Sequence, residues 1–194
     1  MLTNVVEAEI AELAARYGTP RRIAIELQGG PFDPIVMTDR YGEVCMVIRR
    51  PNGKLITAIK TFYPAGAFRL LTGGIQHGEP IADALMREVA EETGLDVAVR
   101  QFLAVIEYHL VRGDRRFVTF AFLLDELGGT LGVQDPSEQI GAFRELAVAK
   151  LPELADTLAR APDQYDQRIA GSWRDWGRFR AVVHQVVHAA LSDG

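Results

Sequence analysis

The chain of 194 residues is 48% hydrophobic and 24% charged, which argues against disorder and provides enough apolar side chains for a substantial core. Its net charge of −5 gives no overall basic field, so we expect neither nucleic acid nor an anionic membrane as a partner. The single cysteine, Cys45, excludes an internal disulfide and a cysteine-based zinc cluster.

The first segment predicts an amphipathic helix. Apolar residues recur at helical spacing from Leu2 to Tyr17, and Gly18 and Pro20 follow as stop signals. The segment lacks the basic stretch and apolar core of a signal peptide. No apolar run approaches the roughly 20 residues that span a bilayer. We therefore expect a cytoplasmic protein that does not enter a membrane.

The rest of the chain predicts strands around one central helix. The expected strands cover residues 21–28, 34–39, 44–50, 54–62, 97–110, 115–124 and 138–146. Asn52-Gly53 is a strong hairpin signal between the third and fourth of these strands. The central helix begins near Pro80 and ends at Gly94, and helical patterns return over residues 149–161 and 165–191. This order predicts a mixed α+β fold without regular alternation of strands and helices.

The central helix carries three glutamates beside its apolar side. Glu88, Glu91 and Glu92 are spaced so that their carboxylates converge, and each like-charged pair costs roughly 0.2–0.5 kcal/mol even in water. Partial burial would raise that cost. Divalent cations such as Mg²⁺ would offset it, because hard ions prefer carboxylate oxygens and often join protein to phosphate. Taken alone, the helix could also be a glutamate-rich surface helix.

Residue spacing decides between these interpretations. Gly73 is followed after five residues by Glu79, and after seven more by the run Arg87-Glu88-Val89-Ala90-Glu91-Glu92-Thr93-Gly94-Leu95. The stretch resembles the Nudix box at every defined position. The box covers only a small part of the chain, but the surrounding strands suit the α/β/α sandwich with a mixed sheet found in that family.

The resemblance implies one domain over residues 1–194. We expect an N-terminal helix at 1–20, a core at about 21–160 and a C-terminal helical extension at about 161–194. Terminal extensions in this family often assemble subunits, and the aromatic and arginine residues of "SWRDWGRFR" suit an interface, so a homodimer is a further expectation.

The implied activity is hydrolysis of the diphosphate linkage of a small nucleoside diphosphate derivative, with release of a nucleoside monophosphate. ADP-ribose or a nucleotide sugar is the favoured substrate. The run "YPAGAF" is similar to a Pro-Ala-Gly element of ADP-ribose enzymes, but "RLLT" separates it from the double glycine. The proline that marks ADP-ribose enzymes about fifteen residues after the box is absent, so the subclass stays open.

The resemblance also implies a ligand set for Mg²⁺ or Mn²⁺, in which Gly73 would contribute its carbonyl. The implied metal ligands are Gly73, Glu88, Glu91 and Glu92, and the implied catalytic residues are Arg87, Glu88, Glu92 and Glu138. Arg87 would orient the carboxylates through its planar fork. Gly73 and Gly74 would let a loop backbone approach the ion. Glu79 is either a secondary ligand or an anchor of that loop.

The general base and the substrate contacts are less determined. Glu138 in "DPSEQIGAF" is either the base or a surface loop residue, and Glu107 is a weaker candidate. Arg49, Arg69 and Tyr108 are our candidates for substrate binding, although most such cations lie on surfaces and most aromatic rings pack in cores.

Two other functions remain under consideration. The chain could be a non-catalytic nucleotide-sensing module with this fold, although degenerate boxes are usual there and this box is complete. It could also be a diphosphate isomerase, which should use a reactive cysteine, and Cys45 lies in an apolar run. The run "HQVVH" places His184 and His188 one helical turn apart, but Gln185 stands where a zinc protease has glutamate.

Overall fold

The computed structural model describes residues 2–192, so the ends of the expected domain, residue 1 and residues 193–194, lie outside the described part. The main helices are α1 (Asn4–Tyr17), α2 (Ile81–Thr93), α3 (Leu151–Ala159) and α4 (Trp173–Ser192), with short 3₁₀ turns η1 (Pro136–Glu138), η2 (Val148–Lys150) and η3 (Gln167–Ile169). None of the helices within residues 2–192 combines the length and apolar character that crossing a bilayer requires.

Seven strands form one mixed sheet in the order β1-β5-β6-β2-β4-β3-β7. They are β1 (Arg21–Leu27), β2 (Arg40–Arg49), β3 (Leu55–Lys60), β4 (Arg69–Gln76), β5 (Leu95–Leu110), β6 (Arg115–Gly129) and β7 (Ile140–Leu146), and the pair β8 (Tyr165–Asp166) and β9 (Gly171–Ser172) forms a separate small sheet. The pairs β1–β5 and β2–β6 are parallel, and the other pairs are antiparallel.

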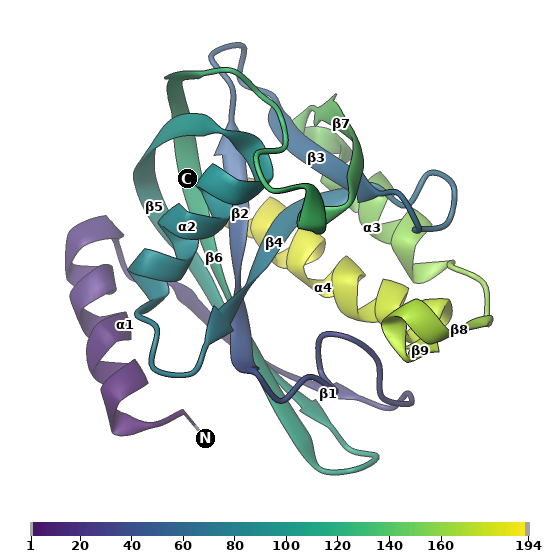
Figure 1. Cartoon of the computed structure of the whole chain (residues 1–194). Coiled ribbons are helices and arrows are strands. Elements are labelled where there is room, and N and C mark those ends of the chain that lie inside the picture. The colour runs from purple at the N-terminus through teal and green to yellow at the C-terminus, as the bar shows by residue number, and fades with distance from the viewer. Residues whose placement is uncertain (1, 193–194) are drawn as a thin grey trace.

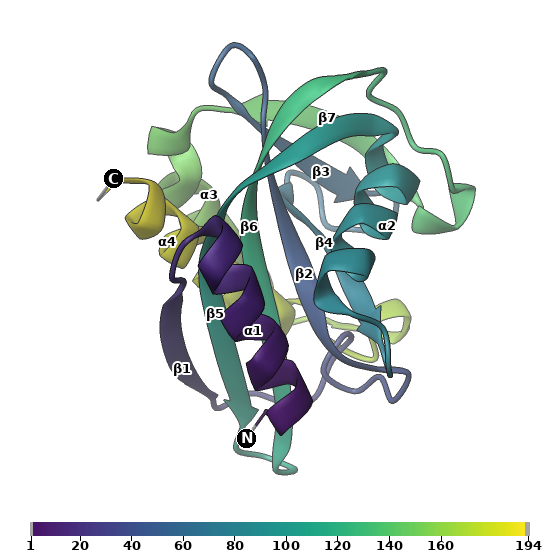
Figure 2. The same ribbon diagram turned by 90° about the vertical axis from the view of Figure 1, so that its left-hand side faces the viewer.

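Helices cover both faces of the large sheet, as Figures 1 and 2 show for α1 and α2 on one face and α3 and α4 on the other. Strand β2 illustrates why both faces are buried. Val44 and Met46 pack toward α1 and α2, while Cys45 and Val47 pack toward α3 and α4. Successive side chains of a strand point to opposite faces, so a continuous apolar run requires a cover on each side. The α+β architecture with a mixed sheet between helical layers is confirmed.

The strand expected at residues 34–39 is wrong. Residues 33–36 form a turn, in which the Val36 N–H donates to the Phe32 carbonyl at 3.0 Å. Pro34 has no N–H to give to a strand ladder, and the apolar Ile35 is buried by packing against the core without strand pairing. The strand begins only at Arg40.

The loop expected around Gly73 and Gly74 is also wrong, because both glycines lie inside β4. Gly73 stands opposite Val44 of β2, in the middle of the sheet. The neighbouring Leu71 and Ile75 are completely buried, and this burial holds the segment extended despite the weak strand preference of glycine.

The hairpin turn at Asn52-Gly53 is present, and the Arg50 N–H donates to the Lys54 carbonyl at 2.8 Å. The strands that it joins separate almost at once, since Arg49 and Leu55 are their only paired residues within the described chain. Strand β4 lies between them in the sheet order.

The helix expected from residue 165 starts only at Trp173. Before it, β8, η3 and β9 form a small hairpin. The Asp166 side chain accepts a hydrogen bond from the Arg168 N–H at 2.9 Å, and Ala170 is left-handed with φ of 48°. Such local hydrogen bonding competes with a helix, so the chain turns here.

Candidate active site

Helix α2 is held at both ends by segments that are distant in the sequence. At its start, the Ile81 N–H donates to Glu9 of α1 at 2.5 Å, because the preceding Pro80 offers no side-chain cap. At its end, Gly94 is left-handed with φ of 63°. The N–H groups of Gln134 and Asp135 donate to the Glu91 carbonyl at 3.0 and 3.2 Å. These bonds bring the loop that carries Glu138 to the helix.

Arg87 is the central hydrogen-bond donor of the site. It donates to both oxygens of Glu79 at 2.8 and 3.0 Å, to Glu88 at 2.8 Å, to Glu91 at 2.9 Å and to the Gly74 carbonyl at 3.0 Å. These bonds use all five guanidinium N–H groups, so Arg87 has no free donor for a substrate. The Glu79 hydrogen bonds raise the pKa of Arg87, and Arg87 lowers the pKa of Glu79. The geometry is that of a residue that positions carboxylates.

Glu79 acts as an anchor in this geometry. Both of its oxygens are bound by Arg87, and Oε2 also accepts the Gln76 N–H at 2.9 Å. The residue therefore fixes the connection between β4 and α2 to the guanidinium of the helix.

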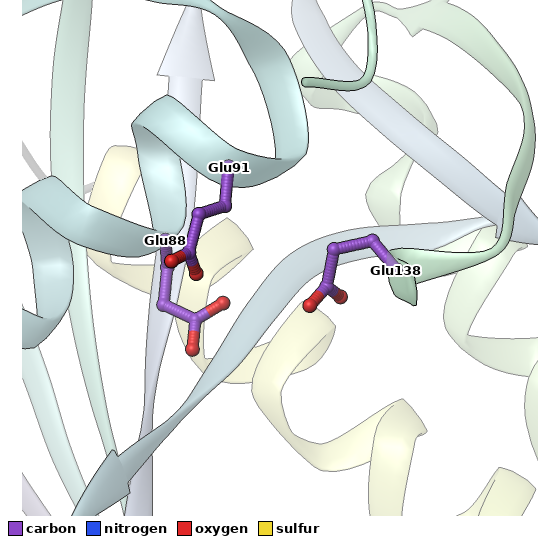
Figure 3. A group of neighbouring side chains, drawn as sticks. All are labelled: Glu88, Glu91 and Glu138. Carbon is purple, nitrogen blue, oxygen red and sulfur yellow. The ribbon is translucent and has the colours of Figure 1, made fainter. Parts of the chain in front are cut away.

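Three carboxylates, one buried and two partly buried, converge beside α2. One oxygen each from Glu88, Glu91 and Glu138 lies within 4.8 Å of the others. Figure 3 shows Glu88 and Glu91 extending from the helix, with Glu138 reaching toward them from the opposite loop. Burial raises the pKa of Glu88, and the hydrogen bond from Arg87 acts against that shift. An oxygen-rich cluster of this kind suits a hard divalent cation.

Glu92 lies deeper, beside this cluster. Its side chain is 1% exposed, and neither carboxylate oxygen has a hydrogen-bond partner among the described residues. Burial raises its pKa to about 8, against the lowering effect of the Arg69 and Lys60 charges. Buried acceptors without a donor are rare and costly. The arrangement therefore fits a cation that would bind these oxygens.

Gly73 gives Glu88 the space that it occupies. A Cβ atom at Gly73 would lie 1.9 Å from the carboxyl carbon of Glu88, which is far inside van der Waals contact. Position 73 therefore requires glycine because the Glu88 carboxylate packs directly against β4. It does not require glycine for its backbone conformation, since the φ of Gly73 is not positive.

A groove of about 540 Å³ runs along the converging carboxylates. Besides Arg87, the cation that lines it is Arg40 at the start of β2. Arg40 binds Asp39 through Nε and Nη2 at 2.9 and 2.8 Å, and its Nη1 has no hydrogen-bond partner within residues 2–192. Sequence reasoning misses Arg40, because no local pattern in the chain marks this residue as part of a site.

The three sequence-based candidates for substrate binding lie in different environments. Arg49 binds Asp125 at 2.8 Å and does not line the groove. Tyr108 is buried, and its ring centroid lies 4.6 Å from that of Phe179 in the core. Arg69 is buried and lines a second, smaller cavity beside the groove. The structure therefore brings Arg69 to the site, and it does not bring Arg49 or Tyr108 there.

The remaining candidates lie away from the groove. Glu107 lines a separate cavity of about 790 Å³ near α1. His184 is completely buried, with Nδ1 bound to the Arg180 carbonyl at 2.7 Å and Nε2 accepting the Leu70 N–H at 2.9 Å. Both of its ring nitrogens are used, so the "HQVVH" segment offers no histidine pair for a metal. Cys45 is buried, and its burial raises the pKa of the thiol, which removes it from nucleophilic chemistry.

Several known proteins are similar to this chain. An ADP-ribose pyrophosphatase of Methanocaldococcus jannaschii is 32% identical over 111 residues, which are 56% of this chain and 63% of that enzyme. The NAD-capped RNA hydrolase NUDT12 of Homo sapiens is 40% identical over 104 residues, or 53% of this chain and 21% of that protein. A NUDIX hydrolase structure from Nitrosomonas europaea has a TM-score of 0.49 at 16% identity, with 60% of this chain and 78% of that chain covered.

The chain thus spans less than two thirds of the length of these two curated relatives. The sequence profile of the NUDIX domain matches residues 39–168, well over half of the chain. This range contains the helix with its carboxylates, the anchoring Glu79 and the loop of Glu138. The chain belongs to the Nudix family.

Proposed function

We propose that this protein is a hydrolase dependent on Mg²⁺ or Mn²⁺ that cleaves the diphosphate linkage of a nucleoside diphosphate derivative and releases a nucleoside monophosphate. The proposal is carried by the two buried Glu92 oxygens, which have no hydrogen-bond partner within residues 2–192 and lie beside the convergent Glu88, Glu91 and Glu138. ADP-ribose or a nucleotide sugar is the favoured substrate. The similarity to an ADP-ribose pyrophosphatase and to a NAD-capped RNA hydrolase supports a diphosphate of the ADP-ribose type.

The metal-binding residues in this proposal are Glu88, Glu91, Glu92 and the carbonyl of Gly73. A bound divalent ion would lower the pKa of a coordinated water and neutralise charge on the phosphoryl oxygens. Arg87 keeps Glu88 and Glu91 oriented toward the groove through its hydrogen bonds. The free Nη1 of Arg40 would bind a phosphate oxygen of the substrate.

Glu138 is the proposed general base. It faces Glu88 and Glu91 from a different element, and Lys60 binds its Oε2 at 3.3 Å. In the proposed reaction Glu138 takes a proton from the attacking water, a new bond forms between the water oxygen and phosphorus, and the bridging P–O bond breaks. The leaving phosphate keeps the bridging oxygen.

The alternative of a nucleotide-sensing module is less well supported, since every carboxylate of the motif is present and oriented. A cytoplasmic location and a homodimer remain predictions, and light scattering of the purified protein tests the second.

The test is a substrate panel with the metal-depleted protein, to which Mg²⁺ or Mn²⁺ is added, and identification of products by mass spectrometry. We expect nucleoside monophosphate from ADP-ribose or a nucleotide sugar. Glu92→Gln should lower kcat at least 100-fold, whereas Glu107→Gln should stay within about twofold of the wild type. No turnover on the whole panel would contradict the function, and an active, folded Glu92→Gln variant would contradict the ligand assignment. Binding of a nucleotide without product would favour the sensing module.

A further inference from the structure

A second cavity of about 90 Å³ opens beside the carboxylate groove, on the side of α4. It is built from the turn that contains Asp33, from β2 and β4, and from Trp176 and Arg180 of α4. Arg40 and Gly74 line both the cavity and the groove, so the two spaces adjoin. Arg40 stands between the carboxylates and the interior of the cavity.

The polar groups of this cavity include an acceptor without a partner. The Asp33 carboxyl makes no hydrogen bond within residues 2–192, although the Asp33 N–H is fixed to the Ile169 carbonyl at 2.7 Å. Burial raises the pKa of Asp33. A half-buried carboxyl that faces a cavity and has no donor is suited to accept hydrogen bonds from a ligand.

Two guanidinium groups provide donors in the same cavity. Arg180 is 5% exposed and gives only Nη1 to Glu43, at 2.7 and 2.8 Å to the two oxygens, while its buried Nε has no partner in the described chain. Arg69 is 3% exposed and uses Nε and Nη1 for Tyr63 and the Leu70 carbonyl, at 3.3 and 2.8 Å. Its Nη2 has no partner among the described residues.

Aromatic side chains provide the apolar wall. Tyr63 and Trp176 line the cavity with their ring centroids 4.7 Å apart, and Phe62 adjoins Tyr63 at 5.0 Å. A ligand that fits this cavity therefore has an apolar face for the rings and a polar edge for Asp33 and the guanidinium groups.

The size of the cavity and its need for a hydrogen-bond donor narrow the class of ligand. The cavity is well below the roughly 300–1,000 Å³ of a site for a drug-sized ligand, so it suits one small ring and not a nucleoside. Four cations, Arg40, Lys60, Arg69 and Arg180, line the cavity with the carboxylates of Asp33 and Glu43, so charge alone also admits a phosphate group. A phosphate dianion has no proton to give to the Asp33 carboxylate, whereas a hydroxyl group has one. A sugar ring has C–H groups on one face and hydroxyl groups at its edge, and hydroxyl groups both donate to carboxylates and accept from guanidinium groups.

We propose that this cavity is the subsite for the sugar ring on the non-nucleotide side of the diphosphate, with Asp33 accepting hydrogen bonds from adjacent ring hydroxyls and Arg69 and Arg180 donating to ring oxygens. The proposal deepens and rests on the proposed function, since Arg40 and the carboxylate groove would hold the diphosphate next to it. In this subsite, Asp33 determines the specificity of the enzyme for a pentose with free hydroxyl groups.

The first experiment measures binding of the sugar product without turnover. Ribose 5-phosphate is titrated into the full-length protein while the fluorescence of its two tryptophans is followed, because Trp176 lines the cavity. We expect binding that weakens at least tenfold in Asp33→Asn and stays unchanged in Asp156→Asn, an exposed carboxylate on α3. The wild type should bind 2-deoxyribose 5-phosphate at least fivefold more weakly than ribose 5-phosphate, a comparison that does not depend on the folding of any variant. Three outcomes would overturn the subsite. The two sugar phosphates could bind the wild type equally, Asp33→Asn could bind ribose 5-phosphate as tightly as the wild type does, or inorganic phosphate could compete at the same concentration as ribose 5-phosphate.

The second experiment separates the subsite from the proposed function. With ADP-ribose and Mg²⁺, Asp33→Asn should raise KM at least tenfold and change kcat by less than threefold, because the reacting phosphates stay in the groove. Turnover by the wild type with an unchanged KM in Asp33→Asn overturns the subsite and leaves the hydrolase. Binding of ribose 5-phosphate that depends on Asp33 without any turnover supports the subsite and overturns the hydrolase.

Discussion

Glu9 of α1 accepts the N–H of Ile81, the first residue of the carboxylate helix α2, at 2.5 Å. The two residues are distant in the sequence, and Glu9 lies outside the Nudix motif. Helix N-termini carry unpaired N–H groups and a positive partial charge, so a carboxylate from another element can serve as the cap. Burial raises the pKa of Glu9, while its backbone hydrogen bonds act against the shift. The N-terminal helix is therefore part of the support of the site.

We expect Glu9→Ala to lower the free energy of unfolding by about 1–2 kcal/mol, the usual cost of losing a cap. Glu9→Gln keeps an acceptor oxygen and should lose less than half of that amount. Glu12→Ala, an exposed position on the same helix, is the matched control. Urea unfolding measures all three variants. If Glu9→Ala were as stable as Glu12→Ala, the hydrogen bond would have no role in holding α2.

Sequence reasoning could locate the carboxylate helix because its information is local. The spacing of Glu88, Glu91 and Glu92, together with Gly94 after the last turn, is set by helix geometry alone. The convergence with Glu138 depends on hydrogen bonds between a distant loop and the Glu91 carbonyl, and only the family resemblance pointed to it.

Other parts of the site depend on long-range packing and could not be predicted. Strand β4 contains two glycines and looked like a loop, but it lies inside the sheet with β2 and β3 as neighbours. Arg40 and Asp33 come to the groove and its adjoining cavity because residues 33–36 turn and α4 packs beside them. No hydrophobic periodicity within residues 28–40 predicts that Asp33 and Arg40 lie beside the groove.

The bidentate contact of Arg87 with Glu79 predicts that these two residues together hold the Glu88 and Glu91 carboxylates in their orientation. Arg87→Met and Glu79→Gln should each lower kcat/KM at least tenfold, because Glu88 and Glu91 lose their orientation. The double variant should be little worse than either one. A double-mutant cycle on unfolding should give a coupling of about 1 kcal/mol, since the pair is partly exposed to solvent.

The control for this cycle is Lys150 with Glu153, an exposed pair on η2 and α3 whose coupling should be within about 0.5 kcal/mol of zero. Strictly additive effects of Arg87→Met and Glu79→Gln on kcat/KM would show that the two residues act independently. That outcome would contradict the positioning role of the contact.

Gly73→Ala tests the close packing between β4 and Glu88. The added Cβ would lie 1.9 Å from the Glu88 carboxyl carbon, so this side chain must leave its position. We expect at least a tenfold weaker apparent affinity for Mg²⁺ or Mn²⁺, measured by the rise in Tm with added metal, and a cooperative unfolding transition that is retained. Gly132→Ala is the control, because a Cβ there meets no atom closer than 4.0 Å. Unchanged metal stabilisation in Gly73→Ala would exclude Glu88 as a ligand.

His184 joins α4 to β4 in its neutral form. A carbonyl can only accept and an N–H can only donate, so the Arg180 carbonyl requires a proton on Nδ1 and the Leu70 N–H requires a free Nε2. Burial, together with the nearby Arg180 and Arg69 charges, lowers the pKa of this imidazole from 6.5 to about 4, against the raising effect of the hydrogen bond to the Arg180 carbonyl. Protonation of Nε2 would break the hydrogen bond from Leu70.

The lowered pKa predicts a loss of stability in acid. Between pH 6.5 and about 4 the unfolded chain binds a proton at His184 that the folded chain does not, so the stabilising contribution is complete above pH 6.5 and falls as the pH decreases. The full loss is on the order of 3 kcal/mol. Buried carboxyls with raised pKa values, such as Asp33 and Glu92, act in the opposite direction. The measurement is therefore the difference in urea unfolding between the wild type and His184→Gln at pH 4.5 and 7. We expect that difference to shrink in acid. An equal difference at pH 4.5 and pH 7 would show that His184 does not titrate as its surroundings require.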